Sequence, residues 1–287
     1  DVYKRQPHRP LPPETLRVLL DSARRRGLSC VVEVGTWDDV AIALGAGARL
    51  LCHLPPEPMP TELSSVIGGA RPDWIPTLAV ALDFRLLIQD EELRASPSLR
   101  RGAPEQLIAD YGAVRVPQSR FAEGRQMQRT LGTNVAVLSE LGVRWRAGSD
   151  SGSVGTFHGW TLLRELQWWA VLGIPNWEIL AGATVEPAEI LGEARGFDPG
   201  ARADFLILPR SPVHDVQVLA QPSALVLGGE LADPAGMYEA VLREVVEVNA
   251  ESPIARMGRG PLFLVLLVVF GVLLGLRSLV KRAVRAT

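Results

Sequence analysis

The chain has 287 residues, of which 30 are Lys or Arg and 32 are Asp or Glu, so its formal net charge at pH 7 is −2. A charge this close to zero gives no electrostatic reason to expect a nucleic-acid partner. Two cysteines are too few for a disulfide framework, and they leave the cellular compartment open.

The first six residues, Asp1 to Gln6, fit no element of a fold. Their sequence is the translation of an adapter used in sequencing libraries, so we interpret 1–6 as a sequencing-adapter scar. A natural polar terminus is the alternative. On the first interpretation the protein begins upstream, and this chain is an N-terminally truncated fragment.

Strand-like apolar runs alternate with helical spacing from residue 7 to residue 195. This alternation predicts α/β architecture with parallel strands. The predicted strands are 28–34, 48–54, 74–80 and the run from Val143 toward Asp150. The predicted helices are 13–26, 37–47, most of 84–141, 160–173 and 176–191.

The sequence changes character after residue 195. Short strands and Gly- and Pro-containing turns, including Gly228 and Gly229, predict a small β-structure over 196–232. A helix over 237–248 and a linker are expected within 233–260.

Residues 261–279 are almost wholly apolar and predict one transmembrane helix, although a buried core helix is the alternative. A basic tail, 280–287, follows. Because basic residues are denser after the span than before it, the tail is expected in the cytoplasm and the large domain on the other, periplasmic side.

Three polar residues stand near the ends of predicted strands. They are Glu33, His53 and Asp150. A charged group within a buried strand is costly unless it is paired or bound to a metal, so the set predicts a metal-assisted hydrolytic site. Each residue also has a structural alternative: His53 as a structural histidine, Asp150 as a turn cap, and Glu33 as the partner of an arginine.

The order of these motifs, with the stretches Phe157-His158-Gly159, Pro187-Ala188-Glu189-Ile190-Leu191-Gly192 and Asp198-Pro199-Gly200-Ala201-Arg202-Ala203-Asp204, resembles the metal-dependent amidohydrolase superfamily, nearest to imidazolonepropionase-like members. The resemblance covers about Leu11 to Leu231. It implies the C-terminal half of a TIM-type (β/α)8 barrel with a small β-sandwich segment.

The resemblance also implies a site and a reaction. A divalent metal, with zinc expected and one or two ions in the full protein, would be held by His53, Asp150 and Glu33. Asp150 would take a proton from the attacking water, and His158 would contact a small-molecule substrate. The reaction would be hydrolysis of an amide, cyclic amide or peptide-like C–N bond.

Two departures from the family pattern qualify this expectation. The His-x-His pair and the often carboxylated lysine of the family cannot be located, and Glu33 stands where the family has histidine. Without those ligands the chain alone is expected to show no turnover. The alternatives are a non-catalytic, membrane-anchored binding or scaffold protein, and an α/β domain without metal in which Glu33, His53 and Asp150 do not converge.

Overall fold

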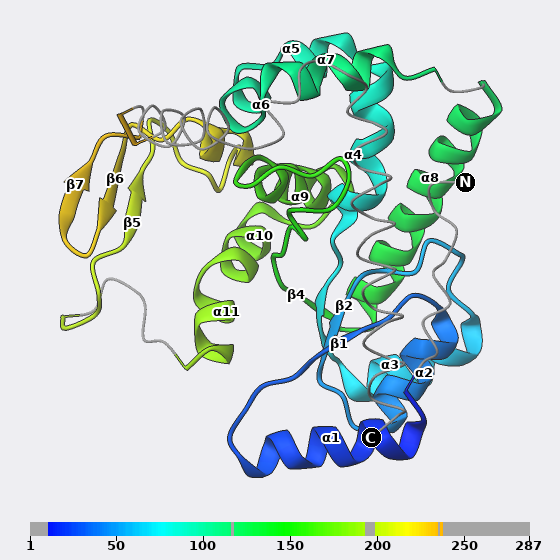
Figure 1. The fold of residues 1–287 in the computed structure, drawn as a ribbon. Coiled ribbons are helices and arrows are strands. Elements are labelled where there is room, and N and C mark those ends of the chain that lie inside the picture. The colour runs from blue at the N-terminus through cyan, green and yellow to red at the C-terminus, as the bar shows by residue number, and fades with distance from the viewer. Residues whose placement is uncertain (1–10, 116–117, 193–198, 235, 238–287) are drawn as a thin grey trace, which may run out of the picture. The chain divides into compact units, whose positions relative to one another are not determined.

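The computed structural model describes residues 11–115, 118–192, 199–234, 236 and 237 (Figure 1). The chain divides into two compact units, Asp1–Ala232 and Asp233–Thr287. In the second unit only 233, 234, 236 and 237 are described, so the fold below is that of the first unit.

A parallel sheet of four short strands forms the centre of this unit, in the order β1 (Val31–Glu33), β2 (Leu50–Cys52), β3 (Asp73–Ile75) and β4 (Arg144–Trp145). Neighbours in the sheet are consecutive in sequence. The strands share one register at their ends, where Glu33 pairs with Cys52 and Cys52 with Ile75. Their carboxyl ends therefore lie at one edge of the sheet.

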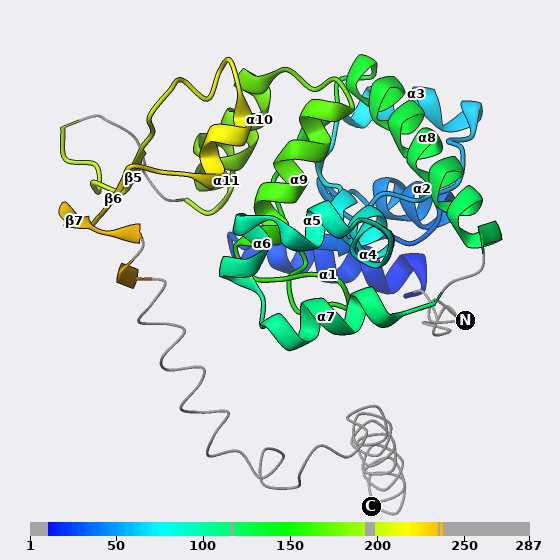
Figure 2. The ribbon, with the colours of Figure 1, turned by 90° about the horizontal axis from the view of Figure 1, so that it is seen from above.

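Helices connect and cover the strands. They are α1 (Pro13–Arg25), α2 (Trp37–Gly45), η1 (Thr61–Leu63), α3 (Ser64–Ala70), α4 (Leu78–Gln89), α5 (Glu91–Ala95), α6 (Pro97–Gly102), α7 (Glu105–Ala113), α8 (Gln118–Glu140), α9 (Trp160–Val171), α10 (Asn176–Ala183), α11 (Val185–Ile190) and η2 (Val216–Ala220). Seen from above, α8 and α9 flank α4 (Figure 2). The mixed α/β class expected from the sequence is confirmed.

The core lies between the sheet and these helices. Leu51 of β2, Trp74 of β3 and Trp169 of α9 are wholly buried within it. The start of α2 shows how local sequence sets an element: Thr36 and Asp39 form a reciprocal capping box, which satisfies backbone N–H groups at the first turn. A smaller cluster, centred on Leu87, Leu99 and Phe157, lies apart from the main core.

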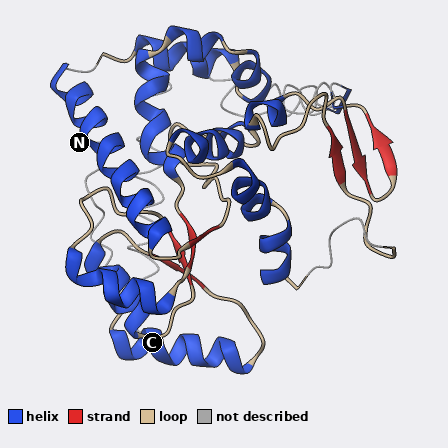
Figure 3. Cartoon of the chain, turned by 180° about the vertical axis from the view of Figure 1, so that it is seen from behind, coloured by secondary structure: helices blue, strands red, loops and turns tan. Residues whose placement is uncertain are grey.

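A second sheet is antiparallel and has the order β5 (Phe205–Ile207), β6 (Ala224–Leu227) and β7 (Glu230–Ala232), shown in red with the first in Figure 3. Gly228 and Gly229 join β6 to β7 with φ of 59° and 88°. Such a two-residue turn needs positive φ at both positions, which glycine adopts without penalty. In the described residues this region is one sheet, without the second layer of a β-sandwich.

Several predicted boundaries were wrong. The strand predicted to run from Val143 toward Asp150 ends at Trp145, so Asp150 lies in the loop after it. The strand predicted over 74–80 ends at Ile75, because Pro76 lacks an N–H and Thr77 turns the chain with φ 49° before α4 begins. The single helix predicted over 176–191 is broken at Thr184, whose φ and ψ of −134° and −89° separate α10 from α11.

Two further expectations concern larger features. The described strands form an open four-stranded sheet, so the TIM barrel is not confirmed. Across the described part of the chain, no helix has the length and apolar character needed to span a membrane. The predicted span, 261–279, and the basic tail lie outside the described residues, as does the adapter-like segment 1–6.

Candidate active site at the carboxyl end of the parallel sheet

Polar residues follow the successive strands of the parallel sheet at its carboxyl end. Glu33 is the last residue of β1, His53 comes directly after β2, Thr77 follows β3 by two residues, and Asp150 stands in the loop after β4. In open and closed α/β sheets this end carries the active-site loops.

His53 makes a hydrogen bond with each ring nitrogen. Its Nε2 lies 3.1 Å from Oε1 of Glu33, and its Nδ1 lies 2.7 Å from Oγ1 of Thr77. A carboxylate can only accept, so Nε2 carries the hydrogen, and in the neutral ring Nδ1 accepts from the Thr77 hydroxyl. The side chain of His53 is 28% exposed and that of Glu33 is 81% exposed, so the pair faces solvent.

Two hydrogen bonds also fix the backbone of His53. Its N–H donates to the carbonyl of Ile75 at 2.8 Å, and its own carbonyl accepts from Nε1 of Trp74 at 2.6 Å. Since Trp74 is wholly buried, this bond ties the loop after β2 to the core.

Asp150 lies in an exposed turn of the loop that follows β4. Its Oδ2 accepts from Oγ of Ser153 at 3.1 Å. The same loop is fixed further on by Gly155, whose N–H donates to the phenol oxygen of Tyr111 at 2.8 Å. His158 is exposed in the turn between the buried residues Phe157 and Trp160, near the start of α9.

His53, Thr77 and Asp150 share a backbone conformation that is rare for residues with side chains. Their φ values are 68°, 49° and 46°, in the left-handed region. The described part of the chain has one further non-glycine residue of this kind, Arg71. Such conformations cost about 1–2 kcal/mol each, and they cluster at functional sites.

The thiol of Cys52, the last residue of β2, has a raised pKa. Burial raises the pKa of its thiol to about 11, and the negative charges of Asp150, Glu33 and Glu165 act in the same direction. A backbone hydrogen bond from His53 opposes them. The carboxylates of the loop after β4 and of β1 thus both lie close enough to act on this thiol.

The described residues do not complete a metal site. His53 and Glu33 are brought together, but within the described ranges no group of three His, Cys, Asp or Glu side chains is arranged to hold an ion. A catalytic zinc needs about three protein ligands and an open position. The predicted set of Glu33, His53 and Asp150 is therefore only partly assembled.

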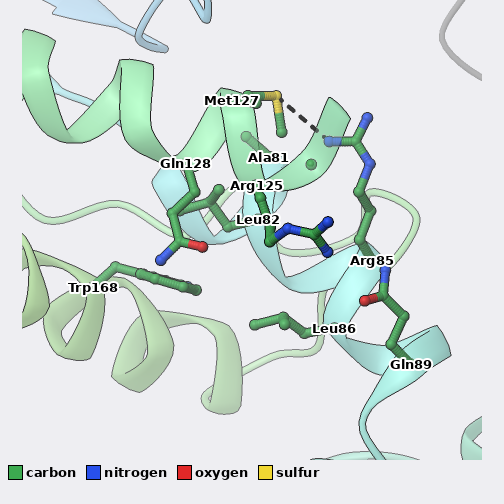
Figure 4. A pocket seen from close by; sticks show the side chains of 10 residues that line it. Ala81, Leu82, Arg85, Leu86, Gln89, Arg125, Met127, Gln128 and Trp168 are labelled. Atoms are coloured by element: carbon green, nitrogen blue, oxygen red, sulfur yellow. Dashed lines mark hydrogen bonds between the residues drawn. The ribbon is translucent and has the colours of Figure 1, made fainter. Parts of the chain in front are cut away.

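An open groove lies along β1, and Glu33 and His53 are among the residues that line it. Its volume is about 940 Å³, within the usual range of ligand sites, and apolar side chains of α1 and α2 line much of it, with Leu16, Leu19 and Ile42 among them. By contrast, the cavity between α4 and α8 has only about 50 Å³, enough for a few waters (Figure 4). There Arg85 donates to Sδ of Met127 at 3.7 Å, and the lining includes none of the predicted site residues.

Sequence reasoning missed two residues of this region. Thr77 was assigned to the middle of a strand, although it follows β3 as His53 follows β2. Glu165 is wholly buried on α9, and burial raises its pKa to about 7 against hydrogen bonds from Ala79, Leu78 and Trp169. The sequence did contain a signal for a buried glutamate, because Glu165 lies on the same helical face as Leu162, Trp168 and Trp169.

Comparison with known proteins gives the class of fold. No protein-family model and no curated protein matches the chain. Among solved structures, a Xaa-Pro dipeptidase with bound methionine in the active site matches over 77% of this chain and 49% of its own length, at 19% identity and a TM-score of 0.55.

Two further structures give the same result. The bottromycin amidohydrolase matches 77% of this chain and 53% of its own, at 23% identity and a TM-score of 0.55. A putative prolidase from Bifidobacterium longum matches 82% and 55%, at 19% identity and a TM-score of 0.55. The chain thus has a fold similar to that of amidohydrolases and prolidases, and it spans about half the length of the structures it matches.

Proposed function

We propose that the chain is part of a hydrolase that cleaves amide bonds, with its active site at the carboxyl end of the parallel sheet. The observation that carries the proposal is the placement of His53, Thr77 and Asp150. All three are left-handed, non-glycine residues, and they follow three successive strands at that end. Strain retained at one edge of a sheet is expected where loops build a site.

Asp150 is proposed as the proton acceptor for the attacking water. Asp150 is exposed, and one of its carboxylate oxygens accepts from the hydroxyl of Ser153. A carboxylate near a bound water can accept a proton in the transition state. His158, exposed in the same loop, is proposed to contact the substrate.

His53 and Glu33 are proposed as the binding pair for the scissile amide or for a divalent ion such as zinc. Both line the large groove, whose apolar walls suit a small peptide-like or cyclic amide substrate. The likeness to a Xaa-Pro dipeptidase and to an amidohydrolase supports this substrate class. A divalent metal held by this pair would lower the pKa of bound water and polarise the carbonyl.

A non-catalytic binding or scaffold protein is the second candidate. The observation that favours it is the hydrogen bond between Glu33 and Nε2 of His53, because it occupies the nitrogen that would otherwise face substrate. In this alternative the groove binds a ligand and Asp150 has no chemical role.

The deciding experiment is hydrolysis by the longest chain that the gene encodes. Dipeptides ending in proline, N-acyl amino acids and cyclic amides would be tested with and without added divalent metals. Turnover that is lost in Asp150→Asn, with unchanged stability, supports the proposal. Saturable binding of the same compounds without turnover would instead establish the binding protein.

Membrane attachment is a separate proposal. We propose that 261–279 anchors the protein with the 280–287 tail in the cytoplasm and the catalytic unit in the periplasm. Its basis is the apolar run and the basic residues after it. Extraction of membranes at alkaline pH tests it: the full chain should stay in the pellet, whereas a chain ending at residue 260 should be released.

A further inference from the structure

The start of α4 lacks the cap that its sequence would normally supply. Thr77 is the residue before the helix, and a threonine there usually accepts a hydrogen bond from the second or third helical N–H. Here Thr77 makes no such bond with its side chain. Its hydroxyl instead lies 2.7 Å from Nδ1 of His53.

Glu165 supplies the missing acceptor from another helix. Its Oε2 accepts from the N–H of Ala79, the second residue of α4, at 2.8 Å, and the N–H of Leu78 also donates to this carboxyl group. Its Oε1 accepts from Nε1 of Trp169 at 2.9 Å, which fixes the group within α9. Glu165 is 0% exposed, so water cannot replace it at the helix end.

We propose that Glu165 is a positioning residue for the candidate active site: by capping α4 from α9, it frees the Thr77 hydroxyl to hold Nδ1 of His53. The orientation and tautomer of His53 then depend on a carboxyl group that does not contact the histidine. An effect of Glu165 on turnover rests on the proposed hydrolase function, whereas its effect on the orientation of His53 does not.

The mechanism is competition for one hydroxyl. Without an acceptor from Glu165, the N–H of Ala79 would be left unsatisfied in a buried place, which is costly. Thr77 could supply a replacement only by leaving its left-handed conformation (φ 49°, ψ 45°) for the extended backbone of an ordinary cap, and its hydroxyl would then leave His53. Burial raises the pKa of Glu165 to about 7, and both forms of the carboxyl group keep an acceptor oxygen for Ala79.

The test is the nitrogen NMR spectrum of the histidine rings in the 287-residue chain, at one fixed pH and without added metal. The chain has four histidines, and His53 is assigned by its absence in His53→Gln. In Glu165→Leu we expect the Nδ1 resonance of His53 to shift, because the Thr77 hydroxyl leaves it. In Glu165→Gln, whose amide oxygen can still accept from Ala79, we expect the wild-type position.

Two controls separate positioning from a general loss of stability. Asp83 is an equally buried carboxylate on α4, and its hydrogen bonds to Arg164 and Trp168 of α9 do not involve the start of α4. Asp83→Asn should therefore leave the His53 resonance unchanged. Thr77→Val should reproduce the Glu165→Leu shift, and the double variant should shift no further, because both changes act on the same hydroxyl.

Three outcomes would each overturn the inference. They are a His53 resonance that stays in place in Glu165→Leu, an equal shift in Asp83→Asn, or additive shifts in the double variant. If Glu165→Leu does not fold, Glu165→Asp carries the same test, because its shorter side chain withdraws the acceptor from Ala79. None of these readouts needs turnover, so a failure of the hydrolase proposal would be seen separately in the activity assay.

Discussion

Gly182 of α10 lies so close to Trp145 of β4 that a Cβ on it would be 2.4 Å from the Trp145 carbonyl oxygen and 3.2 Å from the ring of Trp169. The carbonyl of Gly182 also accepts from the N–H of Ala147 at 2.9 Å. This contact fixes β4, and with it the loop that carries Asp150, against the helices.

Gly182→Ala should therefore destabilise the chain although alanine favours helices. The backbone oxygen of Trp145 cannot move aside, so the overpacking is expected to cost about 1–3 kcal/mol. Gly69 is the matched control, since it is helical and a Cβ there would meet nothing within 4 Å. Gly69→Ala should be neutral or stabilising by up to about 1 kcal/mol. Urea unfolding of both variants measures the difference, and equal effects would contradict the contact.

Replacing Asp150 by glycine should destabilise the chain less than replacing it by alanine. Its φ of 46° favours glycine, so Asp150→Gly is expected to be about 1 kcal/mol more stable than Asp150→Ala. At Asp110, which is exposed within the helix α7, the order should reverse by a similar amount. Thermal unfolding of the four variants checks this. The same order at both positions would show that Asp150 is not strained.

Glu165 should make stability fall as pH rises through neutrality. Its pKa in the folded chain, about 7, lies above the ordinary value of 4.5. The folded state therefore binds the proton more tightly, and the stabilisation is complete below pH 4.5 and lost as pH rises through 7. Between these limits, wild type should lose up to about 3 kcal/mol relative to Glu165→Gln. Denaturant unfolding across pH 4–8 tests this, and parallel curves would refute it.

Cys52 should be unreactive in the folded chain. Burial is the main cause that raises its pKa to about 11 from 9.0, and this leaves about a hundredfold less thiolate at pH 8. Alkylation by iodoacetamide, followed by mass spectrometry of the Cys52 peptide, should be at least that much slower than in urea. Rapid labelling without denaturant would contradict the burial of this strand end.

The 287-residue chain by itself should not hydrolyse amides, even with added zinc. The described residues bring together two donor groups, His53 and Glu33, where a catalytic ion needs about three. Steady-state assays with the substrate panel should therefore give rates no higher than those of Asp150→Asn. Robust turnover would show that the chain completes a site through residues beyond those two.

The sequence by itself determined the α/β class, the four parallel strands and most helices, because apolar periodicity and capping signals are local. It also placed Glu33, His53 and Asp150 near strand ends. It misplaced the end of β4, which stops at Trp145. It also misplaced the end of β3 and the break at Thr184, where single residues with unusual φ and ψ override the apolar pattern.

Only the tertiary structure decided which of these residues meet. The bond between His53 and Glu33, the hydroxyl of Thr77 on Nδ1, and the carboxyl group of Glu165 beneath α4 join segments separated by 20 to 86 positions. Asp150 was foreseen as a strand-end carboxylate, but its left-handed backbone was not. Partners and strain of this kind arise from the packing of distant elements, which no local pattern encodes.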